Sequence, residues 1–288
     1  MLSRFARKNS LRRLLNGVQH LSCERQASTA LDEHEKLIVE SVRRFSVKEI
    51  GPRARGMDEA GELHKDVLQG LFRSGLMGAT IPEKYGGSGF SFFEACLAVE
   101  EISKIDAAVA VIVDIQNTLV NSCLVKWGTE AQKDEWLPQL ATSVASSFSL
   151  SETGSGSDAF ALKTQAQESG DSYILNGEKS WVSNAKEAGL FLVMANADRD
   201  KGYKGVTCFL VPRSTPGLLI GPPEKKLGIR ASSTCALSFD NVKVPKTSIL
   251  GGKGRGYKIA IDALNEGRVG IAAQMIGLAQ GALDVALP

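Results

Sequence analysis

Residues 148–158 read Phe-Ser-Leu-Ser-Glu-Thr-Gly-Ser-Gly-Ser-Asp, and the pattern of the chain changes on either side of them. Phe148 and Leu150 alternate with small polar residues, which predicts a short strand. The Gly- and Ser-rich part that follows predicts a loop ending at Asp158. Such a loop offers backbone N–H groups and hydroxyls with little side-chain bulk, so a phosphate-bearing or heteroaromatic ligand could approach it closely. Further along, Trp181-Val182-Ser183 offers an aromatic plane and a hydroxyl at a second strand end.

Residues 31–145, before this stretch, have the periodicity of helices. Apolar residues recur at helical spacing from Leu37 to Ile50, and Gly51-Pro52 is predicted to end this helix. The Gly- and Pro-rich residues 78–89 predict a structured loop. Four further helices are predicted over residues 65–74, after a capping box of Ser91 and Glu94, over the apolar residues 107–124, and after a cap of Thr129 and Gln132.

Residues 146–250 instead have the pattern of short strands. Residues 173–175 and 180–182 flank Asn176-Gly177, which predicts a two-residue hairpin. Residues 190–195 and 206–211 are nearly continuous apolar runs, and residues 233–239 alternate. About seven short strands separated by prolines predict a small antiparallel β-barrel or sandwich.

After the Gly-rich residues 251–256 the chain becomes helical again and is apolar almost all round. A helix of this kind is expected to be buried on several sides, by partners beyond Pro288. The predicted fold class is therefore an α+β multidomain protein. It has an N-terminal helical domain over residues 31–145, a middle β domain over residues 146–250, and the start of a truncated C-terminal helical domain over residues 251–288.

The composition excludes several classes of protein. A net charge of +2 gives no electrostatic basis for binding nucleic acid. The five cysteines are scattered without CxxC spacing, so neither a metal site nor a disulfide framework is expected. Three histidines, all near the N-terminus, leave little material for a histidine-based hydrolytic centre. The longest apolar run, residues 107–113, is too short to cross a bilayer, so no integral membrane segment is expected.

Residues 1–30 have the composition of a targeting leader. The first acidic residue is Glu24, and the basic residues before it are Arg4, Arg7, Lys8, Arg12 and Arg13. This basic, Ser-containing and amphipathic segment lacks the apolar core of a secretory signal. It predicts a mitochondrial transit peptide and a location in the mitochondrial matrix; the alternative is a basic disordered tail.

Four motifs, read together with the order of helical, β and helical regions, resemble the acyl-CoA dehydrogenases. They are Ser-Glu-Thr-Gly-Ser-Gly-Ser-Asp at residues 151–158, Gly-Glu-Lys-Ser-Trp-Val-Ser-Asn at 177–184, Leu-Gly-Ile-Arg-Ala-Ser at 227–232 and Asn-Glu-Gly-Arg at 265–268. The resemblance extends over residues 31–287. Residues 189–196 and 251–280 are similar to the short/branched-chain members, which act on thioesters of the 2-methylbutyryl-CoA type.

The resemblance implies FAD as cofactor and α,β-desaturation of an acyl-CoA thioester. In this family a carboxylate removes the α-proton while hydride passes from the β-carbon to the flavin. Ser151 and the loop amides would hydrogen-bond the pyrimidine side of the flavin, Trp181 would lie against its face, and Ser183 would bond near N5. The cofactor-binding residues implied are Phe148, Ser149, Leu150, Ser151, Glu152, Thr153, Gly154, Ser155, Gly156, Ser157, Trp181, Val182 and Ser183.

The resemblance also implies a set of thioester contacts. They are Ser157, Tyr203, Tyr257, Asn265, Glu266, Gly267 and Arg268. Most members carry the catalytic glutamate on a later helix, expected beyond Pro288, so no catalytic residue is assigned in this chain. Some members place it directly before the arginine that matches Arg268, where this chain has Gly267. Glu266 is predicted to point elsewhere, because consecutive helical residues differ by about 100°.

Three functional interpretations remain open at the level of sequence. In the first, the chain is a truncated acyl-CoA dehydrogenase that passes electrons to an electron-transferring flavoprotein and forms a homotetramer at full length. Alternatively, it is a catalytically impaired paralogue that binds flavin or acyl-CoA without turnover. The third interpretation is an acyl-CoA oxidase, which the leader and the C-terminal Val-Ala-Leu-Pro disfavour, because that sequence is not a peroxisomal signal.

Overall fold

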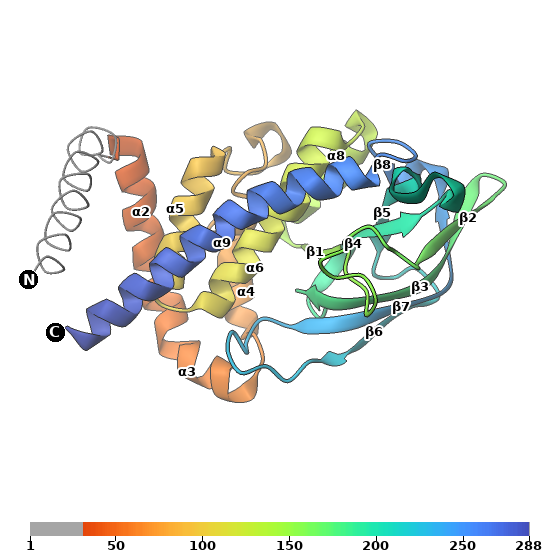
Figure 1. Ribbon diagram of the computed structural model, residues 1–288. Coiled ribbons are helices and arrows are strands. Elements are labelled where there is room, and N and C mark those ends of the chain that lie inside the picture. Colours follow the sequence, from red (N-terminus) through yellow and green to blue (C-terminus); the bar gives the residue numbers. More distant parts are fainter. Residues whose placement is uncertain (1–30, 288) are drawn as a thin grey trace, which may run out of the picture.

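The computed structural model describes residues 31–287, so the predicted transit peptide lies outside the described residues. Helices form one side of the molecule and a β-sheet the other, and the last helix runs along both (Figure 1). The α-helices are α2 (Glu33–Phe45), α3 (Gly51–Ala60), α4 (Lys65–Arg73), α5 (Phe92–Ser103), α6 (Ala107–Asp114), α7 (Ser122–Trp127), α8 (Glu130–Thr142) and α9 (Gly256–Ala286). Between these helices lie two π-helical segments, η1 (Ser46–Ile50) and η4 (Ile115–Asn121), and two 3₁₀ turns, η2 (Leu76–Gly78) and η3 (Glu83–Tyr85). Two further 3₁₀ turns, η5 (Arg199–Gly205) and η6 (Lys246–Ser248), lie between strands.

The strands form one eight-stranded sheet in the order β6-β7-β3-β2-β4-β5-β8, with β1 added beside β4. They are β1 (Ala145–Ser149), β2 (Gln165–Ser169), β3 (Ser172–Ser183), β4 (Ala188–Asn196), β5 (Val206–Pro212), β6 (Leu218–Pro223), β7 (Thr234–Pro245) and β8 (Ile249–Leu250). Most neighbours are antiparallel, but β1 and β2 each pair with β4 in parallel. The prediction of an all-antiparallel β region was therefore wrong in this detail, and the sheet is mixed.

The predicted hairpin at Asn176-Gly177 was also wrong. β3 runs without a break through both residues, and the turn that precedes it lies at Gly170, between β2 and β3. Gly177 has φ 141°, and the pairing of β3 with β7 shifts register between Leu175 and Gly177. A Cβ there would lie 2.7 Å from the Cα of Thr164. The glycine thus serves a β-bulge with a close backbone neighbour, which requires the same residue type as a tight turn.

Gly51-Pro52 does not end the first helix as predicted. α2 continues through the π-helical η1 into α3, and Pro52 lies in the first turn of α3. Pro52 has no N–H to donate, and the π-helical bonding of η1, in which the N–H of Gly51 donates to the Ser46 carbonyl, lies directly before it. The remaining helix predictions are confirmed, including the capping boxes of Ser91 with Glu94 and Thr129 with Gln132.

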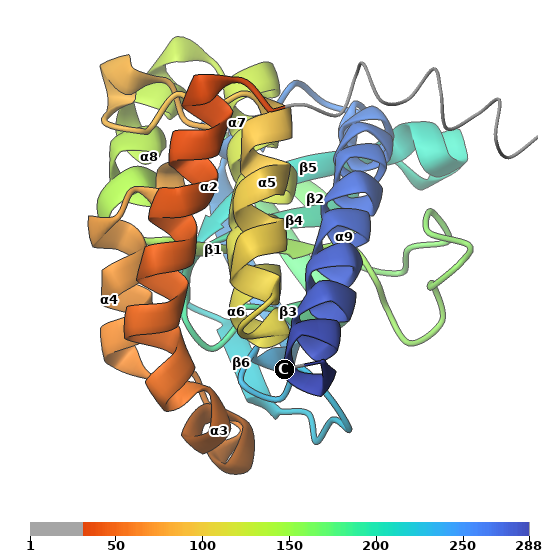
Figure 2. The same ribbon diagram turned by 90° about the vertical axis from the view of Figure 1, so that its left-hand side faces the viewer.

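α9 lies alongside α5 and packs antiparallel to the continuous helix formed by α6, η4 and α7 (Figure 2). Lys126 pairs with Asp262 at 2.7 Å near one end, and the side chain of Gln274 donates to the carbonyl of Ala107 near the other. Small residues allow this close approach; the buried ones on this helix are Gly256, Ala260, Ala263, Gly270, Ala273, Gly277 and Gly281. The helix is buried along one face, and its opposite apolar face is exposed within the described residues, where partners beyond Pro288 were expected.

Within residues 31–287, two helical segments are long and apolar enough to cross a membrane by length and composition alone, Ala107–Trp127 and Gly256–Ala286. In the first, 83% of the tested window is buried inside the protein, as in the core helix of a globular domain. Its polar side chains Gln116, Asn117 and Asn121 bond to backbone groups of neighbouring segments. In the second only 22% is buried, because the face opposite the small residues is open. The absence of a membrane segment remains a prediction.

Candidate functional site

The Ser- and Gly-rich loop begins where β1 ends, at Ser149. It folds back on itself at once, because the backbone N–H groups of Glu152 and Ser155 each donate to the carbonyl of the other at 3.0 Å. The Ser155 hydroxyl then donates to the Asp158 carbonyl at 2.7 Å. A Cβ at Gly156 would meet no atom within 4 Å, and one at Gly154 only the end of the Lys163 side chain. Internal packing does not require these exposed glycines, which is consistent with close approach of a ligand.

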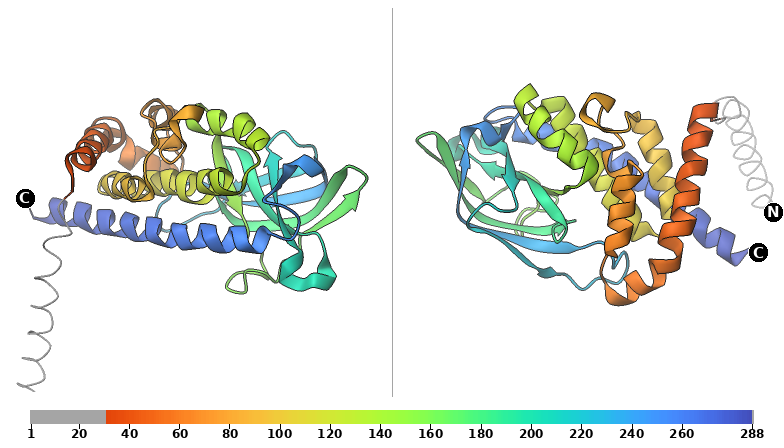
Figure 3. Two further views of the ribbon diagram at one scale, coloured as in Figure 1. Left: turned by 90° about the horizontal axis from the view of Figure 1, so that it is seen from above. Right: turned by 180° about the vertical axis from the view of Figure 1, so that it is seen from behind.

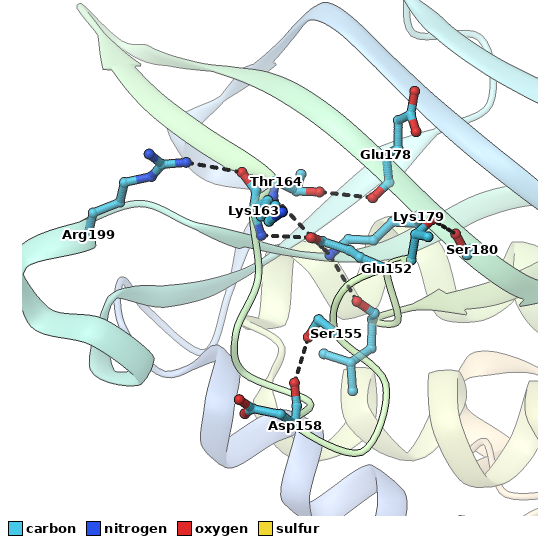
Figure 4. Close-up of polar contacts among 11 residues, drawn as sticks. Glu152, Ser155, Asp158, Lys163, Thr164, Glu178, Lys179, Ser180 and Arg199 are labelled. Atoms are coloured by element: carbon cyan, nitrogen blue, oxygen red, sulfur yellow. Dashed lines mark hydrogen bonds and ion pairs between the residues drawn. The ribbon is translucent and has the colours of Figure 1, made fainter.

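Glu152 does not face the open side of the loop (Figure 4). Its Oε1 accepts from the Nζ of Lys179 at 2.8 Å and from the N–H of Thr164 at 3.1 Å, and its Oε2 accepts from the N–H of Lys163 at 2.6 Å. Lys179 is fully buried and also donates to the Leu150 carbonyl at 2.9 Å. Burial alone would raise the pKa of Glu152, but Lys179 and these N–H groups outweigh it and lower that pKa. Burial lowers the pKa of Lys179 to about 8, so both groups are charged at neutral pH.

Trp181 occupies a strained and exposed position at the end of β3. The register of β3 against β7 shifts between Lys179 and Val182, which makes Ser180 and Trp181 a bulge. Trp181 has φ 59° and is 66% exposed. A left-handed backbone is a genuine outlier for a bulky residue, and bulges often redirect a side chain beside a functional site. Packing does not account for an exposed indole held in this way, so a ligand-facing role is favoured.

Hydrogen bonds join the two predicted cofactor segments. The N–H of Ser180 donates to the Ser151 carbonyl at 2.9 Å, and the hydroxyls of Thr153 and Ser180 lie 3.2 Å apart. In addition, the hydroxyl of Ser147 on β1 donates to the carbonyl of Ser183 at the end of β3. The structure thus brings residues 148–157 and 181–183 together. Trp181, Thr153, Gly154, Gly156 and Ser157 are exposed, whereas the side chains of Ser149, Leu150, Glu152, Ser155 and Val182 are buried.

The residues present fit a planar heteroaromatic cofactor such as a flavin. Two residues in or next to these segments in sequence, Ser149 and Asn184, each have a buried polar atom without a hydrogen-bond partner, the Ser149 hydroxyl and the Oδ1 of Asn184. Asn184 follows the second segment directly and has φ 61°. The exposed indole of Trp181 offers a stacking surface, and the exposed glycines of the loop leave backbone groups accessible beside it.

The predicted thioester contacts fall into two groups. Tyr203 on η5 and Tyr257 on α9 pack edge to face, with ring centroids 5.1 Å apart. Asn265 and Arg268 lie further along α9 and are exposed, and Arg268 donates to the Asn265 side chain at 2.6 Å. The loop after β1, η5 and α9 lie on the same side of the molecule (Figure 3, left).

The environment of Glu266 differs from that of its neighbours. Its carboxylate accepts a hydrogen bond from the hydroxyl of Ser122 on α7, so it faces the helical layer. A Cβ at Gly267 would lie 2.9 Å from the Leu119 side chain. Both positions therefore face the helix formed by α6, η4 and α7, and the prediction that Glu266 points away from the Gly267 position stays a prediction.

Sequence reasoning missed Lys179 and Arg230. The period of a continuous β3 places Tyr173, Leu175, Gly177 and Lys179 on one face, but the predicted hairpin concealed this alternation. Arg230 lies in the motif at residues 227–232, and its Nε donates to the Asp58 carbonyl at 2.7 Å. It thereby ties the loop before β7 to the end of α3, a contact that no local pattern indicates.

Two pockets of the described residues lie away from the predicted site. A pocket of about 500 Å³ lies over α3 and the start of α4, and one of about 300 Å³ lies between α2 and the segment from Ser74 to Phe90. Neither contains a predicted site residue. The predicted site is characterised by its exposed aromatic residues and by the exposed glycines of the loop.

Comparison with known proteins identifies the family. Residues 32–143 match the acyl-CoA dehydrogenase N-terminal domain, and residues 147–242 match the acyl-CoA dehydrogenase middle domain. The short/branched chain specific acyl-CoA dehydrogenase, mitochondrial, of Bos taurus is 57% identical over 89% of this chain. This chain spans 59% of the length of that bovine relative.

Solved structures agree with the sequence relatives. Butyryl-CoA dehydrogenase from Megasphaera elsdenii superposes with a TM-score of 0.86 at 36% identity, over 88% of this chain and 68% of that one. A glutaryl-CoA dehydrogenase from Mycobacterium smegmatis in complex with FADH2 superposes with a TM-score of 0.82 at 32% identity, over 88% and 64% of the two chains. The chain therefore belongs to the acyl-CoA dehydrogenase family.

Proposed function

We propose that this protein binds FAD at the loop of residues 148–158 and the bulge at Trp181, and takes part in the α,β-dehydrogenation of short or branched acyl-CoA thioesters. The observation that carries the proposal is the exposed indole of Trp181, held at φ 59° beside the Ser- and Gly-rich loop. The bovine relative named for short/branched-chain substrates and the glutaryl-CoA dehydrogenase in complex with FADH2 support it.

The residues of this chain would bind and orient the reactants. Trp181 supplies a rigid stacking plane, while Ser151, Ser183 and the loop amides supply donors for the polar edge of the cofactor. Ser157 lies at the exposed end of the loop, within reach of a CoA chain crossing this face. When bound, the flavin would supply the acceptor for hydride from the β-carbon of the thioester.

Exposed and half-buried side chains on α9 and η5 would contact the thioester. Tyr203 and Tyr257 form an aromatic corner, and Arg268 offers a guanidinium for phosphate or adenine groups of CoA. The Nη1 of Arg268 donates to the Oδ1 of Asn265 at 2.6 Å, which restricts the orientation of the guanidinium.

We assign the α-proton abstraction to none of residues 31–287. Glu266 already accepts from Ser122, and Gly267 has no side chain at the position that some members use. The carboxylate expected by family resemblance belongs to a helix beyond Pro288. The competing function is binding of flavin or acyl-CoA without turnover.

We further propose that the protein acts in the mitochondrial matrix and passes electrons to an electron-transferring flavoprotein. The mitochondrial name of the bovine relative and the basic leader composition support the location. The electron acceptor and a homotetrameric full-length form rest on family resemblance alone, as does a role in branched-chain amino-acid catabolism.

Expression of residues 30–288 followed by a visible absorption spectrum tests the proposal. Bound flavin that bleaches on addition of 2-methylbutanoyl-CoA under anaerobic conditions is the result expected of a dehydrogenase. Bound flavin without bleaching supports the binding function. Absence of flavin after reconstitution with excess FAD contradicts the assignment of the site.

A further inference from the structure

The Glu152–Lys179 ion pair contacts the loop at both of its ends. At the start of the loop, after β1, the Nζ of Lys179 donates to the Leu150 carbonyl at 2.9 Å. At the end of the loop, before β2, the Glu152 carboxylate accepts from the N–H groups of Lys163 and Thr164 at 2.6 and 3.1 Å. The Nζ-to-Oε1 contact of 2.8 Å joins these two sets of bonds (Figure 4). Residues 153–158, which are exposed except for Ser155, therefore lie on an arch whose two ends are fixed by one buried pair.

The same pair also adjoins the bulge that presents Trp181. Lys179 is the last residue in register with β7 before the bulge, and the next N–H, from Ser180, donates to the Ser151 carbonyl. Thr164 adds a second link to β3, because its hydroxyl donates to the Glu178 carbonyl at 3.1 Å. Displacement of the Lys179 side chain would loosen the arch and the start of the bulge together.

Burial of this pair is costly, so its presence needs a reason. The side chain of Lys179 is 0% exposed and that of Glu152 is 7% exposed. Replacing a buried ion pair by apolar residues is often neutral or stabilising, so such a pair is weak evidence of a stability role. Here each charged group bonds to backbone of a different segment, which an apolar pair cannot reproduce.

We propose that Glu152 and Lys179 are positioning residues that fix the loop of residues 150–164 relative to the Trp181 bulge, and that Glu152 does not contact the ligand. For the identity of the ligand, this inference rests on the proposed flavin function. The pair keeps the loop amides and the indole at a fixed separation, so that a planar cofactor meets both at once without first ordering the loop.

Amide hydrogen exchange of the full chain, measured by mass spectrometry, tests the positioning role without any cofactor. In Lys179→Met, we expect exchange in residues 150–164 and 178–184 to accelerate by about tenfold or more, while α9 stays as in wild type. The affinity for added FAD, measured by fluorescence quenching, is expected to fall by about tenfold or more. The matched control is Lys186→Met, which removes a lysine paired at 2.7 Å with Glu62 but 44% exposed.

The double variant Glu152→Gln with Lys179→Met separates positioning from charge compensation. The double variant leaves no unpaired buried charge. Its melting temperature should therefore return toward that of wild type, whereas Glu152→Gln and Lys179→Met alone should each lower it. Under our proposal loop exchange stays fast and FAD affinity stays weak. Recovery of all three properties would mean that the pair only balances charge, and unchanged exchange in Lys179→Met would also overturn the proposal. If wild type binds no FAD, the proposed function fails, while the exchange data still decide the positioning role.

Discussion

Gly270 of α9 lies directly against the carboxylate of Asp114 at the end of α6: a Cβ at Gly270 would lie 1.9 Å from Asp114 Oδ1. Asp114 is 1% exposed and accepts a hydrogen bond from the Thr118 hydroxyl at 3.0 Å. The thiol of Cys96 on α5 lies near it, and burial, with Asp114 as a further cause, raises the pKa of Cys96 to about 11. A long apolar helix is thus packed on a buried acid, and its contact residue carries no side chain.

Gly270→Ala is expected to lower the free energy of unfolding by about 1–3 kcal/mol, because the added methyl group overlaps Asp114. The gain from replacing a helical glycine, roughly 0.5–1 kcal/mol, is too small to offset this overlap. Gly56→Ala on α3 is the matched control, since a Cβ there meets no atom within 4 Å. Gly56→Ala should raise the free energy of unfolding, which is measured for both variants by urea titration. Equal stability of both variants would contradict the packing described here.

Asp114 is also expected to make stability depend on pH. Burial raises its pKa from 3.8 to about 7, and the Thr118 hydrogen bond only partly opposes this. Between these values the folded protein retains a proton that the unfolded chain releases. Stability therefore falls as pH rises through this window, by up to about 4 kcal/mol, and levels off above about pH 7.

Asp114→Asn removes this contribution while it keeps an acceptor for Thr118. The variant should be more stable than wild type at pH 8, and the difference should shrink as pH falls toward 4. Asp106 and Glu187, whose pKa values are also raised mainly by burial, are present in both proteins and cancel in the comparison. Asp134→Asn, at an exposed position on α8, should give a profile parallel to wild type in urea titrations from pH 4 to 8.

Trp181→Gly should affect stability and cofactor binding in opposite directions. Glycine relieves the strain of φ 59°, so the free energy of unfolding should rise by about 1 kcal/mol or stay unchanged. Loss of the indole should weaken FAD binding by about tenfold or more, because stacking supplies much of the contact. Trp181→Phe keeps an aromatic plane and should retain most of the affinity by equilibrium titration. A marked loss of stability in Trp181→Gly would mean that the indole is a structural residue.

The open face of α9 is expected to make the chain self-associate. It carries the exposed apolar side chains Ile261, Val269, Ile271, Met275, Ile276, Leu278, Leu283 and Val285. A continuous apolar surface of this kind favours association in water. Sedimentation velocity should show association that increases with concentration and that Ile276→Glu with Leu283→Glu reduces. Leu219→Glu, an exposed apolar position on β6, should leave it unchanged. A wild-type chain that stays monomeric up to high concentration would contradict this expectation.

Local patterns predicted the helices well because their signals act within a few residues. The capping boxes at Ser91 and Thr129 each satisfy N–H groups of their own helix, so the residues that decide them are adjacent in sequence. The failures at Gly51-Pro52 and Asn176-Gly177 have one cause. Each dipeptide is compatible with a break, but also with the first turn of a new helix or with a bulge. Contacts from distant segments, such as Thr164 against Gly177, choose between these outcomes.

The sequence by itself determined the order of helical and β regions, the family, and the candidate residues at 148–158, 181–183 and 265–268, because those signals are periodic or carried by motifs. Only the tertiary structure decided which of these side chains are available. It buried Glu152 against Lys179, turned Trp181 outward through a bulge, and directed Glu266 toward Ser122. These outcomes depend on register shifts and on contacts between residues far apart in the chain. A one-residue change of register reverses the face of every later side chain, and short-range sequence patterns do not encode it.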